Sequence, residues 1–187
     1  MARVFDRLSV WMDPVPRNGP AQMACDEALL ADAEEAVLRV FRWSEPWVSA
    51  GYFVPWSEAW ARQRPDESYR VLHLAAAEAL QAAGVDAALF DGGSAGGAEC
   101  FAGPVRYDVM SGSRKIAGGA QRRTKRGLLH QGSIQGTGLG EDFATVLASH
   151  LAGETVSWNP PELFESAVSG LLREKYTRED FLRREVP

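Results

Sequence analysis

The stretch from residue 100 to residue 134 constrains the fold of this 187-residue chain more than any other part of the sequence. Apolar and polar residues alternate over residues 105–110, and residues 111–113, Ser-Gly-Ser, then have the composition of a tight turn. The next run, residues 114–121, holds few bulky side chains, and glycines within a strand often mark a place where another group approaches the backbone closely. The pattern predicts two or three antiparallel strands with a ligand site beside them.

The composition narrows the class of protein. The chain is 45% hydrophobic and 24% charged, which suits one globular domain over residues 1–187. Its formal net charge of -5 argues against a nucleic-acid partner. The two cysteines, Cys25 and Cys100, lie too far apart in sequence to suggest a disulfide framework or a metal site. The sequence contains neither an apolar signal segment nor a membrane span, so we expect a cytoplasmic protein without a membrane partner.

Hydrophobic periodicity predicts strands and helices in an α+β arrangement, with a mixed or antiparallel sheet flanked by helices. Strands are predicted over residues 8–12, 37–43, 47–53 and 85–90, in addition to the hairpin. Helices are predicted over residues 21–36, 55–62, 66–83, 141–151, 160–172 and 177–182. Cys25 falls among small and apolar residues of the first helix, which predicts a packed and unreactive thiol. His73 lies in the helix over residues 66–83 and has no second metal ligand one turn away, so we interpret it as an ordinary helix residue.

Two side chains of the central stretch are candidates for chemistry. Cys100 could accept an acyl group as a thioester if a nearby cation or helix N-terminus lowers its pKa. Lys115, in a glycine-flanked strand, could hold a carbonyl or phosphoryl oxygen on which negative charge develops. The residues alone leave the simpler alternatives open, namely that Cys100 is a small buried hydrophobe and Lys115 a solvated surface group.

Four segments of the sequence resemble one known family. They are MACDEALL, LRVFRWSEPWVSAGYF, CFAGPVRYDV and RKIAGGAQRRTKRGLLHQGSI, which together reach from Met23 to about Phe143. The chain resembles the lipoate-protein ligase and octanoyltransferase family, whose catalytic fold is shared with biotin protein ligases. The resemblance implies a catalytic domain of that fold.

The resemblance also assigns roles to individual residues. Lys115 matches the lysine that contacts the acyl carbonyl or acyl phosphate, and Cys100 matches the cysteine that carries the acyl group in one octanoyltransferase branch. The remaining implied substrate-binding residues are Gly118 and Ala120, which would line the acyl channel, and His130 and Gly132, which belong to the adjoining strand.

Two departures from the family pattern bear on function. The family's Arg-Arg-x-Thr-Gly-Gly-Gly segment is absent between Pro65 and Asp66, where a pocket wall and at least one strand are expected. The sequence also ends at Pro187, soon after the predicted catalytic-domain helices, whereas ligases that activate free lipoate commonly carry a further small C-terminal domain. Together with Cys100, this second departure favours acyl transfer from a carrier-protein thioester.

Three functions are therefore considered. The first is an octanoyl or lipoyl transferase that needs no cofactor, takes the acyl group from acyl carrier protein onto Cys100 and passes it to a lysine of a lipoyl domain. The basic run over residues 122–126 could meet such acidic partners, or could be a solvated hairpin turn. The second is an ATP-dependent lipoate ligase using ATP and Mg, in which Cys100 is incidental. The third is a non-catalytic acyl-binding relative.

Overall fold

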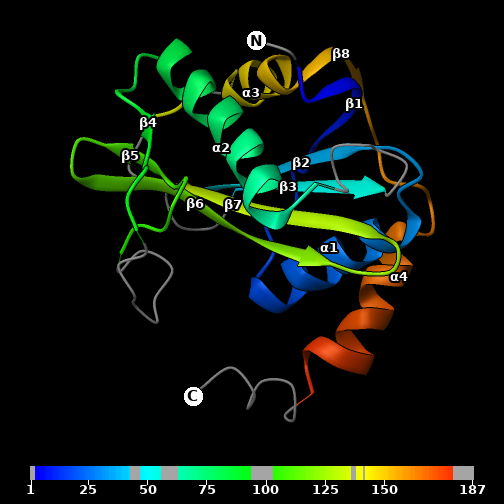
Figure 1. The fold of residues 1–187 in the computed structure, drawn as a ribbon. Helices are drawn as coiled ribbons and strands as arrows, with labels where there is room; N and C mark the ends of the chain where they lie inside the picture. Colours follow the sequence, from blue (N-terminus) through cyan, green and yellow to red (C-terminus); the bar gives the residue numbers. More distant parts are fainter. Residues whose placement is uncertain are drawn as a thin grey trace.

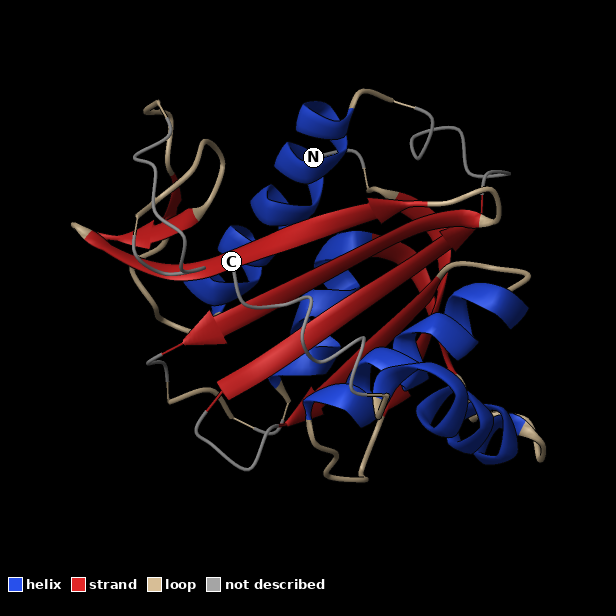
Figure 2. Cartoon of the chain, turned by 90° about the horizontal axis from the view of Figure 1, so that it is seen from below, coloured by secondary structure: helices blue, strands red, loops and turns tan. Residues whose placement is uncertain are grey.

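The computed structural model of the chain describes residues 3–42, 47–55, 63–93, 103–135, 138–140 and 142–178. Within these residues, eight strands form one twisted sheet in the order β4-β5-β6-β7-β3-β2-β1-β8. The helices α2 and α3 cover one face of this sheet, and α1 and α4 cover the other (Figure 1; Figure 2 shows the sheet from below). This arrangement confirms the predicted α+β class with a mixed sheet.

The elements follow the chain as follows. The strands are β1 (Phe5–Met12), β2 (Val37–Arg42), β3 (Trp47–Pro55), β4 (Ala88–Leu89), β5 (Val109–Ser111), β6 (Arg114–Arg123), β7 (Gly127–Gln135) and β8 (Ala152–Ser157). The helices are α1 (Gly19–Asp32), α2 (Pro65–Ala82), α3 (Phe143–Leu151) and α4 (Phe164–Leu171), and a π-helical turn over Leu172–Tyr176 continues α4.

The sheet combines an antiparallel part and a parallel part. The strands from β4 through β5, β6, β7 and β3 to β2 are antiparallel neighbours. β1 is parallel to both β2 and β8, and α1 makes the crossover from β1 to β2 that a parallel pair requires. The hairpin of β6 and β7 therefore lies well inside the sheet, with β3 bonded along the whole of β7.

Each face of the sheet has its own apolar core. The core under α2 and α3 includes Leu72, Ile116, Leu128 and Ile134, and the core under α1 and α4 includes Leu129. Leu128 and Leu129 are neighbours on β7, and because successive side chains of a strand point to opposite faces, they pack in different cores. Residues on β7 can therefore reach both helical layers.

Three observed elements have bounds that differ from the predicted ones. The predicted strand over residues 105–110 is wrong in its first half, because a turn occupies residues 105–108 and β5 begins only at Val109. Tyr107 has a positive φ of 72°, its N–H donates to the carbonyl of Phe90, and its chain neighbour Asp108 folds back to accept from the N–H of Val105. The predicted strand over residues 85–90 shortens to Ala88–Leu89, and the helix predicted over residues 160–172 begins at Phe164.

Two predicted helices fall partly on residues outside the described ranges, and one observed strand was not predicted. Of the helix predicted over residues 55–62, residues 56–62 lie outside the described residues, and Pro55 belongs to β3 instead. Of the helix predicted over residues 177–182, residues 179–182 lie outside the described residues, and residues 177–178 form a turn and a bend. β8 was not predicted, although it forms one edge of the sheet. Among the described residues, no helix combines the length and apolar character needed to cross a membrane.

Candidate active site

Five polar side chains meet where α2 crosses β6 and β7. Tyr69 and His73 come from α2, one helical turn apart, and Asp108 comes from the turn before β5. Lys115 is on β6 and His130 is on β7. Three of the five, Tyr69, His73 and Asp108, were not among the residues singled out as functional from the sequence.

The Lys115 ammonium is held by a buried carboxylate. Its Nζ lies 2.8 Å from Oδ2 of Asp108, whose side chain is fully buried. The same oxygen accepts from the N–H of Val105 at 2.7 Å, and Oδ1 accepts from the Tyr69 hydroxyl at 2.6 Å. A buried carboxylate is tolerated when its oxygens are paired and hydrogen-bonded, as these are. The ion pair therefore fixes where the lysine head group lies.

At Gly118 and Gly119, other groups occupy the space that a side chain would need. A Cβ at Gly118 would lie 2.5 Å from Cε of Lys115 and 3.1 Å from Oδ1 of Asp108. A Cβ at Gly119 would lie 2.6 Å from the backbone oxygen of Gln131 and 2.8 Å from Nε2 of His130. The nearest distance at each glycine, 2.5 Å at Gly118 and 2.6 Å at Gly119, is far shorter than a carbon contact allows. The glycines in β6 thus mark a close approach, made by the chain's own lysine and histidine.

The two histidines form a neutral, hydrogen-bonded pair. Nδ1 of His73 is 2.9 Å from the carbonyl oxygen of Tyr107, which can only accept, so this nitrogen carries the proton. Nε2 of His73 is then an acceptor for Nε2 of His130 at 3.2 Å. Burial lowers the pKa of His73 to about 4, and burial followed by the neighbouring His73 lowers the pKa of His130 well below its ordinary value. Both imidazoles are uncharged near neutral pH.

A small apolar cavity adjoins this pair. Its volume of about 20 Å³ holds roughly one water molecule. The lining residues are Leu72, His73, Ala76, Ala117, Gly118, His130, Gly132, Ser133 and Ile134. Three of the four residues expected to bind substrate, Gly118, His130 and Gly132, therefore lie together. The fourth, Ala120, is exposed on β6 and does not line this cavity.

Of the two cysteines, Cys25 is the one that lies among the described residues. Cys100, the expected nucleophile, lies outside the described residues. Cys25 is fully buried in α1, and burial raises the pKa of its thiol to about 12. A thiol that stays protonated and is shielded from solvent is a poor nucleophile. The burial confirms that Cys25 is packed, and its low reactivity stays a prediction.

A second buried polar cluster lies on the opposite face of the sheet, against α1. Arg39 is fully buried and pairs with Asp13 at 2.5 Å and with Asp26 at 2.7 Å. Gln131 donates to the other oxygen of Asp26. Burial raises the pKa of Asp26 to about 6, although Arg39 acts to lower it. The cluster joins two of the four segments, because Asp26 lies in MACDEALL and its partner Arg39 lies in LRVFRW. The signal in the sequence was an acid and an arginine within apolar runs.

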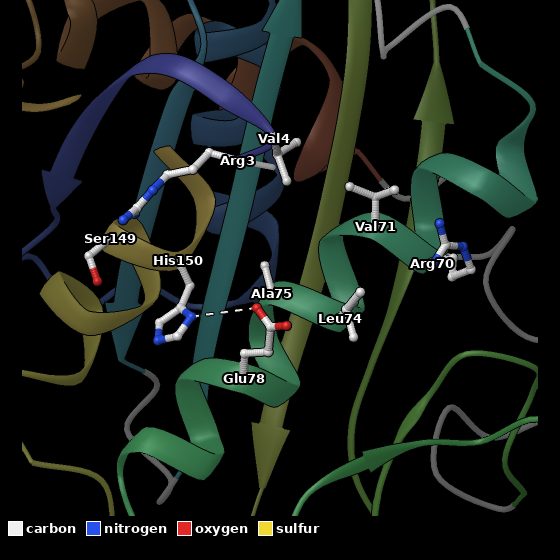
Figure 3. Close-up of a pocket in the computed structure, with 9 residues that line it drawn as sticks. All are labelled: Arg3, Val4, Arg70, Val71, Leu74, Ala75, Glu78, Ser149 and His150. Atoms are coloured by element: carbon white, nitrogen blue, oxygen red, sulfur yellow. Dashed lines mark ion pairs between the residues drawn. The ribbon is translucent and has the colours of Figure 1, made fainter. Parts of the chain in front are cut away.

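A larger groove of about 540 Å³ is separate from this site. It lies along α2, α3 and the start of β1, and Figure 3 shows its lining. Its charged groups have partners: His150 lies 3.6 Å from Glu78, Arg70 pairs with Glu67, and Arg3 donates to the carbonyl of Ala152. None of Lys115, Asp108 or the paired histidines lines it. Within the described part of the chain, no group of three or more metal-ligating side chains is arranged to hold a metal ion.

The comparison with known families identifies the family of the chain. The family model of the lipoyl protein ligase A/B catalytic domain matches residues 57–184. The chain belongs to this family. Membership confirms the resemblance inferred from the four sequence segments, and with it the expectation of an enzyme. No curated protein matches the chain significantly.

Solved structures agree on the fold. A lipoate-protein ligase A bound with ATP superposes with a TM-score of 0.78 at 14% identity, covering 96% of this chain and 100% of the other. A lipoate protein ligase of T. acidophilum with bound lipoic acid, described as putative, gives 0.72 at 15% identity, with coverage of 94% and 98%. A bi-partite lipoate protein ligase of Thermoplasma acidophilum, studied with its E2 lipoyl domain, gives 0.64 at 13% identity, with coverage of 99% and 98%. At these identities the likeness concerns the fold.

Proposed function

We propose that the chain transfers an octanoyl or lipoyl group to a lysine of a lipoyl domain, with Lys115 at the acyl oxygen. The observation that carries the proposal is the ion pair of Lys115 with buried Asp108 at 2.8 Å, placed against Gly118 on the wall of a small cavity. A positive charge fixed in advance stabilises the negative charge that develops on a carbonyl oxygen during acyl transfer, without reorganising at that moment.

We further propose that Cys100 carries the acyl group between donor and acceptor. Its thiolate, formed when the Cys100 thiol gives up its proton, attacks the thioester carbonyl of an acyl carrier protein. The new S–C bond forms, the old one breaks, and the carrier thiolate leaves and takes up the proton that Cys100 gave up. The acceptor lysine amine then attacks the acyl-Cys100 carbonyl. The C–N bond forms, the C–S bond breaks, and the amine proton returns to the sulfur. Lys115 stabilises the oxyanion in both steps.

Intact mass spectrometry tests the nucleophile. Incubation with octanoyl-acyl carrier protein is expected to add one octanoyl group to the wild-type protein and none to Cys100→Ser. Cys25→Ala is the matched control, because the thiol of Cys25 is buried in α1. The adduct is expected to persist in Cys25→Ala. No adduct on the wild type, or an adduct that persists in Cys100→Ser, would contradict the assignment.

A second pair of variants tests the lysine. Lys115→Met is expected to lower the rate of octanoyl transfer to a lipoyl domain by about 10²–10³, the usual effect of removing one oxyanion-stabilising group. Lys175→Met, in the π-helical turn after α4, removes a lysine that pairs with Glu27 and takes no part in the proposed site, and it is expected to leave the rate unchanged. Equal rates for the two variants would contradict the role of Lys115.

ATP-dependent ligation of free lipoate is the second candidate function. The fold shared with a lipoate-protein ligase A bound with ATP favours it. ATP, when bound, would activate the carboxylate of the free acid. The positive charge of the Lys115 ammonium, which lies against Gly118 beside the cavity, suits a group with negatively charged phosphates. Lipoate-dependent release of pyrophosphate from ATP, undiminished in Cys100→Ser, would establish this function in place of transfer from a carrier protein.

The partners are proposed from charge and kinship. Arg122, Lys125 and Arg126 are exposed at the hairpin of β6 and β7, where they offer positive charge to an acidic carrier or lipoyl domain. Their local contacts, Arg122 with Glu27 at 3.8 Å and Arg126 with the carbonyl of Ala31, orient two of the three. The study of a Thermoplasma acidophilum ligase together with its E2 lipoyl domain supports a lipoyl domain as acceptor.

A further inference from the structure

Tyr69 occupies the centre of the candidate active site without being one of the residues that the proposed reaction uses. It lies on α2, one turn before His73, with its hydroxyl between Asp108 and the backbone of Gly119. Its ring stacks on the ring of His73 at 3.9 Å and meets the ring of His130 edge-on at 5.4 Å, measured between centroids. One side chain thus contacts both halves of the site, the ion pair and the paired histidines.

The Tyr69 hydroxyl orients the carboxylate that holds Lys115. A hydroxyl has one proton to donate, and the nearer, charged acceptor is Oδ1 of Asp108 at 2.6 Å, compared with the Gly119 carbonyl at 3.2 Å. This bond fixes the rotation of the carboxylate about its last side-chain bond. Oδ2 is then turned toward Lys115 and the N–H of Val105.

Among the described residues, the same hydroxyl takes the place of a strand partner for β6 at Gly119. Pairing between β5 and β6 reaches only as far as Val109 and Ala117, so β6 continues past the end of β5. At Gly119 the backbone N–H donates to the Tyr69 oxygen at 3.1 Å. The tyrosine therefore anchors β6 directly after Gly118, the residue against which the Lys115 side chain lies.

We propose that Tyr69 is a positioning residue for Lys115: through Asp108 on one side and Gly119 on the other, it sets the place of the lysine ammonium beside the small cavity that Gly118 lines. The proposal rests on the proposed function, because Lys115 is given its task there. Removing the hydroxyl while keeping the ring releases both the carboxylate and the backbone of β6, and Lys115 gains freedom to move.

Lysine labelling measures that freedom without any enzyme assay. The chain has three lysines, Lys115, Lys125 and Lys175. Brief acetylation with acetic anhydride followed by peptide mass spectrometry gives the labelling of Lys115 relative to exposed Lys125. In Tyr69→Phe this ratio is expected to rise about fivefold, the factor for losing one hydrogen bond of ordinary net strength. A ratio equal to that of the wild type overturns the proposal.

The chain supplies a matched control. Tyr176 donates to Glu27, which also pairs with Lys175, so a second tyrosine-carboxylate-lysine arrangement exists on the opposite face of the sheet. Tyr176→Phe is expected to raise the labelling of Lys175 and to leave the Lys115 ratio unchanged. A Lys115 ratio that rises equally in Tyr176→Phe and Tyr69→Phe would show general loosening and overturn the proposal. Should Tyr69→Phe fail to fold, Asp108→Asn is labelled in its place, and an unchanged ratio there is equally decisive.

Kinetics then separate positioning from a merely structural role. For octanoyl transfer, Tyr69→Phe is expected to lower kcat about tenfold to a hundredfold, the effect of misplacing a catalytic group, with the KM for the acyl donor little changed. A raised KM with unchanged kcat overturns the positioning role. A wild-type protein that transfers no acyl group refutes the proposed function, while the labelling ratio still decides how Lys115 is held.

Discussion

Replacing His73 by asparagine removes one titrating group from the candidate site with little change of shape. The asparagine amide can still donate to the carbonyl of Tyr107, as Nδ1 of His73 does at 2.9 Å. It cannot bind a proton in the range in which histidine does. The perturbation therefore isolates the effect of protonating His73 on the stability of the fold.

The magnitude follows from the pKa of His73 in the two states. Burial lowers this pKa from an ordinary value of 6.5 to about 4 in the folded protein. The unfolded chain then binds a proton at a higher pH than the folded chain, so stability is full above pH 6.5 and is lost as the pH falls toward 4. Between about pH 7.5 and about pH 5 the loss assigned to His73 is about 2 kcal/mol in the free energy of unfolding.

Urea unfolding of the wild type and His73→Asn at the two pH values measures this difference. Asp26 acts in the opposite direction, because burial raises its folded pKa to about 6, and that contribution is common to both proteins. The wild type is expected to lose about 2 kcal/mol more than the variant on going from about pH 7.5 to about pH 5. Equal losses in the two proteins would refute the account of a neutral, buried His73.

Three further predictions concern single residues. Gly119→Ala is expected to destabilise the fold by about 1–3 kcal/mol, because its Cβ would meet the backbone of β7. Gly118→Ala mainly displaces the flexible end of Lys115, with a lesser contact to Asp108, and is expected to impair transfer more than thermal stability. Equal melting temperatures for the two variants would contradict this. Asp26→Asn is expected to lose more stability than the wild type as the pH falls from about 7 toward 4, because the variant lacks the proton uptake by Asp26 that offsets part of the loss, and urea unfolding measures the difference. Cys25 is expected to resist iodoacetamide in the folded protein and to react after unfolding, and rapid alkylation of the native protein would contradict its burial.

Periodicity predicted the elements of the fold better than the contacts between them. The alternating and glycine-rich runs around Lys115 gave the hairpin, and helical spacing gave α1, α2 and α3. β8 was missed because its sequence, AGETVS, is short and mostly polar or small, and its place beside β1 depends on pairing with a strand nearly 150 residues away. Such long-range parallel pairing leaves little trace in local sequence.

The candidate site was only partly predictable for a related reason. Lys115 and the glycines of β6 are conspicuous in the sequence because their pattern is local. His73 and Tyr69 look like ordinary residues of an amphipathic helix, and their role arises only when α2 crosses β7 at His130. Asp108 was hidden within an apparent strand, since alternation in sequence does not reveal that Tyr107 adopts a positive φ and turns the chain.

The two faces of the sheet share one strand, β7. Consecutive residues of this strand point in opposite directions, so His130 reaches the paired imidazoles under α2 while Gln131 reaches Asp26 and the buried arginine cluster under α1. A change that moves β7 in order to reshape the cavity will therefore also strain the ionic cluster behind it. Substitutions on the two faces should therefore be selected together, as one set of compensating changes.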